Sequence, residues 1–460
     1  MDYSKKRIEL REPVFKEMAE AVGGKLGRAI ADEFRDYYTL FEDGMIDWYA
    51  NLYDVKYGGY YYSNSARDND FVTWRGETYP LLPDTESTIQ ALNAMDSLGL
   101  TAHVGGSYKN LIPEWMFNDI VAFIKGIQHP NGFFYHPQWG KEAVDKRLNR
   151  RGRDLVFCCN FLKKHGLSPY YDTPNGQLKG ERSAIPDPSD PAAKVAPSVR
   201  EIPEHLLDKE HFIAYLEGHD MSKESYHFGN ELCTQMGQIG ARDRELEEMG
   251  KDYKLFDIML DWLEAQIDPN TGHWSHEANN YGINGFLKAG SIFNASKRKY
   301  PYIDRLIESI IAGITSSEPT GGGVDLFNMW WSFSNAAYNM NHCYENGAEM
   351  IEKMYRTLLE NAPNLIRVTK EKQAVIKKPD GSFSYGKLYS SPTSQDMPVA
   401  IPNSVEGDIN GNGISGFGTV TRIANILRLG DKLPGVYFDF DARRYMDIIE
   451  GKRAEFLKNG

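Results

Sequence analysis

Apolar residues recur at helical spacing along most of the chain. In segment 252–267, Phe256, Met259, Leu260 and Leu263 recur every three or four positions, which places them on one face of a helix. The same spacing predicts helices near 13–35, 84–98, 114–128, 153–165, 204–217, 227–248, 279–296, 302–314, 328–342, 345–361, 417–429 and 441–457. The chain is therefore predicted to be all-α, with its helices arranged as hairpins.

Alternating runs rich in Val, Ile and Thr, which are typical of strands, are scarce. The best strand candidates are 59–62 and 366–389, where Pro379-Asp380-Gly381 predicts the turn of a small β-hairpin insertion. Segment 175–203 is rich in proline and has no helical periodicity, so we expect a long loop there. Because helical hairpins continue on both sides of this loop, we expect a single domain over residues 1–460.

A short motif, a polar turn followed by glycine and aromatic residues, occurs four times. The copies lie at 54–61, 128–134, 266–274 and 379–383. Two of them follow an amphipathic helix that ends in Gln, and both place Pro-Asn before the glycine. Such turns also arise independently in unrelated proteins. Four copies nevertheless favour one supersecondary unit that is used repeatedly.

The segments Gln128-x-Pro-Asn-Gly132-Phe and Gln266-x-x-Pro-Asn-x-Gly272-x-Trp274 resemble the Gln–Gly–Trp/Phe turns of the α/α-toroid superfamily. That superfamily includes terpenoid cyclases, six-hairpin glycosidases and several polysaccharide lyases. The resemblance implies an (α/α)6-7 toroid of helical hairpins with minor β-hairpins, and a rim on which loop 175–203 would lie. It also implies a cleft at the N-terminal ends of the inner helices. The acidic motifs of the cyclases, Asp-x-Asp-Asp and Asp-Asp-x-x-Asp, are missing, so carbohydrate is the favoured substrate.

Charge and motif content exclude several other classes of function. The 460 residues carry a net charge of −12, which disfavours nonspecific binding to nucleic acid. No run of about 18 apolar residues is present, so no membrane span is expected. The sequence contains no Walker loop, Rossmann fingerprint, Gly-x-Ser-x-Gly elbow or His-Glu-x-x-His motif. We therefore expect neither a cofactor nor a catalytic metal.

Two features favour a cytoplasmic location. The N-terminal residues are charged and lack the apolar stretch of a signal peptide. The four cysteines, Cys158, Cys159, Cys233 and Cys343, form no C-x-x-C pair and fit reduced, mostly buried thiols.

The acidic residues at the start of helix 84–98 are the first candidate for chemistry. Asp84 or Thr85 lies where the helix begins and Glu86 falls in its first turn, which faces the cleft if the chain is a toroid. A carboxylate there can act as a general acid or base. The same residues are also favoured as an N-cap and as a partner of the helix dipole.

The second candidate is a repeated His-x-x-Asn spacing before two apolar helices. His227 and Asn230 form one copy, followed by Glu231; His276 and Asn279 form the other, followed by Asn280 and Tyr281. On a helix this spacing puts both side chains on one face. Helix capping by the asparagines and packing of the histidines explain the same residues without a functional role.

The third candidate is an aromatic loop followed by arginines. Tyr135, His136 and Trp139 suit stacking against a sugar ring, as does Trp274 in the later turn. Arg147, Arg150, Arg151 and Arg153 follow, and Arg153 at the start of helix 153–165 is the best placed to hold a carboxylate. A solvated basic loop is the alternative interpretation.

The last candidate is the segment Glu406-Gly-Asp408-Ile-Asn410-Gly-Asn412-Gly413, which resembles the first half of a calcium loop. Position 12 is Thr419 instead of a bidentate glutamate, so an EF-hand is not expected. A helix-capping turn explains these residues, with Asp408 facing the cleft.

Three functions remain open. The first is a lyase that cleaves uronate-containing oligosaccharides by β-elimination, with Tyr281 as base helped by His227, and with Asn230 or Asn280 and Arg153 on the substrate carboxylate. The second is an inverting glycoside hydrolase that uses Glu86 or Asp84 with Glu231 or Asp408. The third is a sugar-binding toroid without catalysis. The lyase is favoured because the His, Asn and Tyr sets are duplicated while no carboxylate pair is evident. Further substrate contacts are expected from Tyr135, His136, Trp139, Asp84, Glu231, Trp274 and His276.

Overall fold

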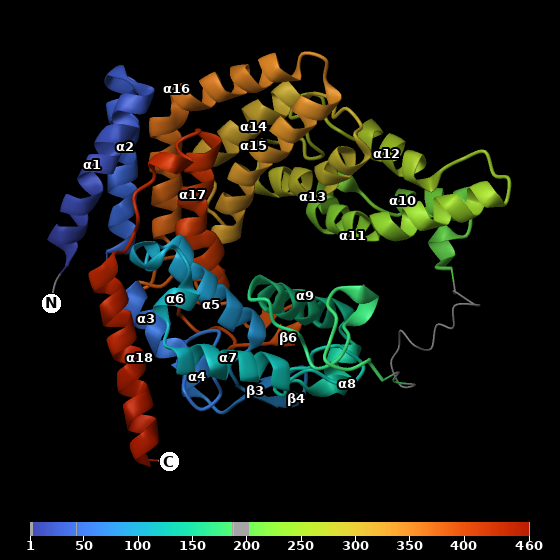
Figure 1. The fold of residues 1–460 in the computed structure, drawn as a ribbon. Helices are drawn as coiled ribbons and strands as arrows, with labels where there is room; N and C mark the ends of the chain where they lie inside the picture. The colour runs from blue at the N-terminus through green and yellow to red at the C-terminus, as the bar shows by residue number, and fades with distance from the viewer. Residues whose placement is uncertain (1–2, 43, 186, 188–201, 460) are drawn as a thin grey trace.

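The computed structural model describes residues 3–42, 44–185, 187 and 202–459, and this part of the chain is mainly helical (Figure 1). The longer helices are α1 (Ser4–Val22), α2 (Gly24–Tyr37), α3 (Met45–Leu52), α5 (Thr85–Ser97), α7 (Glu114–Gly126), α9 (Leu148–Lys164), α10 (Lys209–Glu217), α11 (Met221–Glu248), α12 (Leu255–Ala265), α13 (Asn280–Ser296), α14 (Ile303–Thr315), α15 (Gly323–Cys343), α16 (Gly347–Ala374), α17 (Phe417–Ile426) and α18 (Asp439–Asn459). Shorter helices are α4 (Asn64–Asp68), α6 (Tyr108–Leu111) and α8 (Gly140–Asp145). The prediction of a mostly α protein is confirmed.

Strands in the described part of the chain form only two-stranded antiparallel sheets. These pair β1 (Tyr53–Asp54) with β2 (Gly59–Tyr60), β3 (Phe71–Trp74) with β4 (Glu77–Pro80), and β5 (Thr393–Ser394) with β6 (Met397–Pro398). Strand β2 lies within the predicted strand 59–62. The β3–β4 hairpin is short and exposed, and its sequence carries no apolar alternation that would have predicted it.

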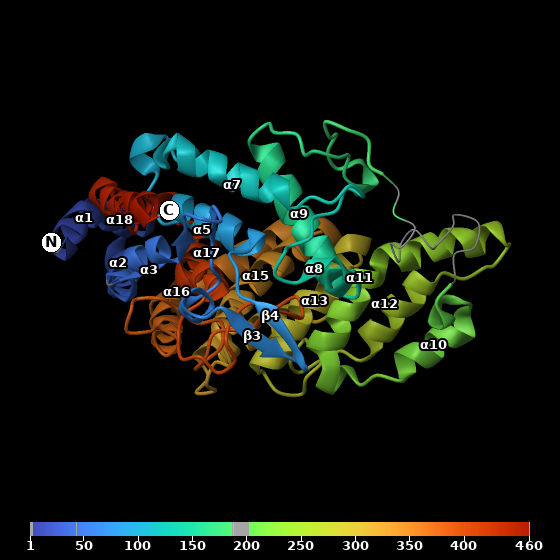
Figure 2. The ribbon, with the colours of Figure 1, turned by 90° about the horizontal axis from the view of Figure 1, so that it is seen from below.

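Six helices pack side by side in a curved row. Helix α9 contacts α5, and α5 contacts the wide helical turn η5 (Gly411–Gly416), which runs directly into α17. From α17 the row continues through α15 and α13 to α11. Helices α12, α14 and α16 pack against this row, and α16 also contacts α2. Helices α1 and α18 lie at one end of the molecule, and α10 and α12 at the other (Figure 1, Figure 2).

The sequence explains where these helices begin. Asp84 caps α5 by accepting a hydrogen bond from the Ser87 amide, and Asn279 caps α13 in the same way through the Gly282 amide. Helix α12 buries Leu255, Met259, Leu260 and Leu263, so its apolar stripe is the predicted one with Phe256 partly buried beside it.

Three of the repeated turns share one backbone geometry. In each, the backbone amide of the first residue of the turn donates to the carbonyl of the residue after the glycine. The glycine amide in turn donates to the carbonyl of that first residue. The first residue, the glycine and the residue after it are His129, Gly132 and Phe133 in one turn, Asp268, Gly272 and His273 in the next, and Lys378, Gly381 and Ser382 in the third. Glycines 132, 272 and 381 all have positive φ. The motif therefore marks a turn that requires glycine, and the copy at 54–61 forms the β1–β2 hairpin.

Some predicted boundaries are wrong. Helix α11 starts at Met221, six residues before the predicted start of 227–248, because Asp220 supplies a cap that was overlooked. Predicted helix 13–35 is two helices, which break at Gly23, where φ is +84°. Helix α16 runs to Ala374, so the first part of the predicted hairpin 366–389 is helical, although its turn at 379–381 forms. Much of the predicted loop 175–203, residues 188–201, lies outside the described residues.

We expect Gly272→Ala to destabilise the protein strongly. The residue has φ +71°, and an added Cβ would lie 2.4 Å from the amide nitrogen of Leu306 and 2.7 Å from the carbonyl oxygen of Tyr302. Left-handed strain and overpacking together should lower the free energy of unfolding by about 2–4 kcal/mol. Urea denaturation followed by circular dichroism measures this.

The matched control is Gly166→Ala, where φ is +65° and no atom lies within 4 Å of the added Cβ. It should lose only about 1 kcal/mol, from backbone strain alone. Equal losses in the two variants would show that the packing around the repeated turn does not matter.

Candidate active site

A buried ion-pair network joins the first turn of α5 to helix α9. Glu86 is only 3% exposed, and its Oε2 accepts a hydrogen bond from Arg150 Nη1 at 2.8 Å. Its Oε1 accepts from Nε and Nη2 of Arg153 at 3.0 and 2.7 Å. The Ser394 hydroxyl of β5 donates to Oε2 at 2.9 Å. Burial acts to raise the pKa of Glu86, but the two arginines outweigh it and the pKa is lowered. Glu86 is therefore an ionised anchor, poorly suited to donate a proton.

Arg150 is the fully buried centre of this network. Its Nη2 and Nε donate to the two carboxylate oxygens of Asp154 at 2.6 and 3.2 Å, and Thr85 donates to the same carboxylate. The guanidinium also lies 5.2 Å from the ring centre of Trp139. Two carboxylates and two arginines thus balance in charge, as buried ionised groups require.

Arg153 reaches out of this network toward solvent. Its side chain is 40% exposed, whereas that of Glu86 is 4% exposed. One edge of its guanidinium binds Glu86 and its face lies 5.0 Å from the Phe157 ring centre. Its Nη1 has no hydrogen-bond partner among the described residues. A guanidinium held along one edge and open along the other is arranged to bind an anion.

Next to the ion pairs lies a second polar group around Asp408. The Gln90 amide donates to Glu86 Oε1 at 3.1 Å and to Asn410 Oδ1 at 2.8 Å, which links the two groups. The Tyr62 hydroxyl donates to Asp408 at 3.1 Å and itself accepts from the Asn410 amide. Burial raises the pKa of Asp408 to about 6, although the backbone amides of Tyr385, Gly411 and Ser391 oppose the shift. Asp408 is fully buried, so its role is to hold the Tyr62 hydroxyl and the Tyr385 backbone in place through hydrogen bonds.

Tyr385 extends the site toward α11 and α15. Its backbone amide donates to Asp408 at 2.8 Å, and its hydroxyl has no hydrogen-bond partner among the described residues. Burial raises the pKa of Tyr385 to about 12, with Tyr226, Asp408 and Asp325 acting in the same direction and Arg153 opposing them. The charges of Arg153, Asp325 and Asp408 therefore all act on the Tyr385 hydroxyl. A phenol with this pKa is protonated at neutral pH and can donate a proton.

Of the residues in the predicted His-x-x-Asn sets, His227 and Tyr281 lie next to each other and close to Tyr226. The ring centres of His227 and Tyr281 are 6.2 Å apart, and His227 neighbours Tyr226. Burial raises the pKa of Tyr281, the backbone amides of His227 and Tyr226 oppose it, and Glu224 adds to it. The cation that Tyr281 needs as a base is not among the groups that act on it. Asn280 is buried, and its backbone amide donates to Glu318.

Other predicted site residues make their hydrogen bonds outside the networks around Glu86 and Asp408. Asn230 and Glu231 are exposed, and Glu231 accepts a hydrogen bond from the Tyr215 hydroxyl of α10. His276 is exposed and binds Asp268 at 2.7 Å. Asp84 is buried, with Ser87 donating to both of its oxygens. Roles for these residues in catalysis or substrate binding stay predictions.

The predicted aromatic contacts are mostly buried. Trp139 and Trp274 donate their indole N–H groups to the carbonyls of Pro398 and Leu263. His136 is fully buried, and burial lowers its pKa to about 3, so it stays neutral. The Tyr135 hydroxyl donates to Asp145 at 2.9 Å. These contacts explain the aromatic residues structurally, and sugar stacking by them remains untested.

Sequence reasoning overlooked Tyr385, Ser394 and Gln90. Tyr385 and Ser394 lie in a segment without helical periodicity, and only their distance from Asp408 and Glu86 reveals them. Gln90 follows Glu86 by one helical turn, and that spacing was available as a signal.

Comparisons with known proteins give no further indication, since no family model, curated protein or solved structure matches the chain. No helix among the described residues combines the length and apolar character that a membrane span needs. Within the same described ranges, no group of three or more His, Cys, Asp or Glu side chains is placed to hold a metal ion.

We expect Glu86→Gln to destabilise the fold. The substitution leaves two arginines facing one carboxylate in a buried network, so the free energy of unfolding should fall by about 3–5 kcal/mol. Thermal and urea denaturation measure it. Glu142→Gln is the control, because Glu142 pairs with Lys146 on the surface and should give no measurable change. Equal stability of the two variants would contradict the assigned strength of the network.

A pH series tests the environment of Asp84. Burial raises its pKa to about 7, so the folded protein favours the protonated form. The stabilisation that this proton provides is complete below about pH 4 and is lost as the pH rises through about 7. Asp84→Asn keeps a capping oxygen but does not titrate. We expect the difference in unfolding free energy between wild type and variant to change over this range. A constant difference would contradict the raised pKa.

Proposed function

We propose that the protein is a carbohydrate-active enzyme of the α/α-toroid type that cleaves uronate-containing oligosaccharides by β-elimination. The observation that carries this proposal is Arg153, whose guanidinium is fixed on buried Glu86, is 40% exposed, and lowers the pKa of Tyr385 through its charge. The curved row of helices α9, α5, α17, α15, α13 and α11, with outer helices packed behind it, supports a toroid.

The chemistry of β-elimination suits these groups. A base removes the proton α to the uronate carboxylate, the C–O bond to the leaving sugar breaks, and a C=C bond forms between the two carbons. Negative charge grows on the carboxylate during proton removal, and Arg153 is placed to stabilise it. The leaving oxygen needs a proton, which the protonated hydroxyl of Tyr385 can supply.

The base is proposed to be His227, with Tyr281 packed against it. An imidazole is the most frequent general base in enzymes, and His227 is exposed and contacts the ring of Tyr226, which acts on the pKa of Tyr385. The raised pKa of Tyr281 disfavours a phenolate there. We therefore assign proton removal to His227 instead of Tyr281, the residue predicted from the sequence.

An inverting hydrolase is the alternative, and it needs two carboxylates on opposite sides of the bond. Glu86 is held ionised by two arginines, Glu231 binds Tyr215, and Asp84 and Asp408 are buried. Three of the four carboxyl groups are therefore buried, and the exposed one, Glu231, is hydrogen-bonded to Tyr215. A sugar-binding protein without catalysis would use the same Arg153, but it would not need the tyrosine hydroxyls.

The activity is tested with uronate oligosaccharides, by following the ultraviolet absorbance of the unsaturated product. Arg153→Gln should lower kcat/KM by about 10²-fold or more, because one charge-stabilising donor is lost. Arg305→Gln is the control, since Arg305 is exposed and pairs with Glu308. Saturated products would instead establish the hydrolase, and binding without turnover would establish the sugar-binding protein.

Two tyrosine variants separate the proton-transfer roles. Tyr385→Phe removes only the hydroxyl, so kcat should fall by about 10²-fold or more while folding is retained. Tyr281→Phe should keep most of the activity if His227 is the base. The opposite result, with turnover lost only in Tyr281→Phe, would restore Tyr281 as the proton-transferring residue.

A further inference from the structure

Arg422 lies apart from the ion pairs around Glu86, in the middle of α17. Its guanidinium carbon lies 5.0 Å from the ring centre of Phe327 and 5.1 Å from that of Trp331, both on α15. The two rings meet edge to face at 5.7 Å, and Trp331 is 39% exposed. Aromatic faces hold the arginine in place, but they do not neutralise its charge.

The charge of Arg422 has no partner within the part of the chain that the structure describes. The guanidinium makes no salt bridge or hydrogen bond there, and its Nε is a buried donor without an acceptor. Burial lowers the pKa of Arg422, and no carboxylate acts against it. Arg422 is half-buried, so its charge is only partly solvated, and no carboxylate compensates it. A half-buried, unpaired guanidinium in the wall of a cavity is placed to bind an anion.

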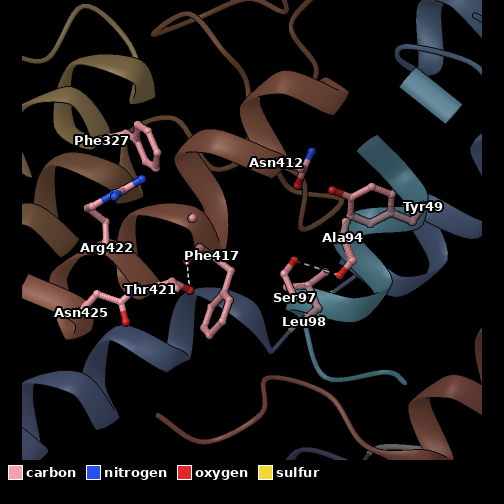
Figure 3. Close-up of a pocket in the computed structure, with 12 residues that line it drawn as sticks. Tyr49, Ala94, Ser97, Leu98, Phe327, Asn412, Phe417, Thr421, Arg422 and Asn425 are labelled. Carbon is pink, nitrogen blue, oxygen red and sulfur yellow. Dashed lines mark hydrogen bonds between the residues drawn. The ribbon is translucent and has the colours of Figure 1, made fainter. Parts of the chain in front are cut away.

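The cavity beside Arg422 has a volume of about 250 Å³. Figure 3 shows Arg422 and Phe327 on one side of it, and Tyr49 and Asn412 on the other. The Tyr49 hydroxyl makes no hydrogen bond to a described residue, so it is a second free donor. Ser97, Thr421 and Asn425 add polar groups to the lining. The volume is below the range of about 300–1,000 Å³ of drug-sized sites, so the cavity suits a small ligand.

We propose that this cavity is a second binding site, which takes a small oxyanion on Arg422. The ligand class comprises carboxylates, sulfate and phosphate, all of which match the two-pronged geometry of a guanidinium. The site is distinct from the one at Arg153, because the cavity is lined by the last turn of α5, with Ala94 and Ser97, whereas Arg153 binds Glu86 in the first turn of that helix. The proposal therefore does not depend on the lyase activity.

The test measures the thermal unfolding midpoint of the full-length protein in potassium sulfate, potassium phosphate and potassium glucuronate, each against potassium chloride at equal ionic strength. An oxyanion that binds only the folded state raises the midpoint with concentration. Comparison of glucuronate with the inorganic anions distinguishes a sugar carboxylate from a free ion as the preferred ligand. Titration calorimetry gives the affinity of the best of them.

Arg422→Gln should weaken the affinity at least about tenfold, because a charge-assisted donor is lost. Arg422→Lys should retain part of the response, since it keeps the charge. Arg428→Gln is the control: Arg428 also stacks on a ring, Tyr355, but pairs with Glu352 on the surface. It should respond like wild type.

Two results would overturn the proposal. These are no stabilisation of wild type by any oxyanion beyond chloride, and equal oxyanion responses in wild type and Arg422→Gln. The second result would assign Arg422 a purely structural role.

Discussion

The buried carboxylate of Glu86 is the constraint on which the candidate site depends. Taking an ionised group out of water is unfavourable unless partners surround it, and here Arg150, Arg153 and Ser394 do so from two other parts of the chain. The carboxylate therefore fixes how α5, α9 and the β5 loop approach one another. It also fixes Arg153, because two of its nitrogens are committed and only one edge is left for a ligand.

Buried ion pairs contribute little net stability compared with apolar packing of similar volume. Their presence at the N-terminal end of α5 therefore needs another reason, and positioning a half-exposed arginine is a sufficient one. Asp408 satisfies the same constraint differently: it is surrounded by backbone amides and the Tyr62 hydroxyl, and its pKa is raised to about 6. The pKa values of the two carboxylates are thus shifted in opposite directions within one connected network, joined through Gln90 and Asn410.

Much of the fold could be predicted from the sequence, because apolar periodicity reports directly which helix face is buried. The start of α11 was missed because the inward position between buried Met221 and Phe228 is the polar Ser225, so apolar periodicity carries little signal there. The repeated glycine turns were found for a physical reason, since positive φ restricts those positions to glycine. The aromatic residues were harder to interpret: Trp139 and Trp274 have polar groups that find buried carbonyl partners, which no local sequence shows.

The site was only partly predictable for a geometric reason. Spacing of three or four residues places two side chains on one helix face, but it does not say which face points inward. On α11 the buried stripe includes Ser225, Phe228 and Leu232, which leaves His227 and Asn230 on exposed positions. Glu86 and Arg153 are 67 positions apart in the chain, and their contact depends on helix packing that periodicity does not determine. Charge compensation supplies the missing information, because a buried carboxylate requires its arginines nearby, whatever their distance in sequence.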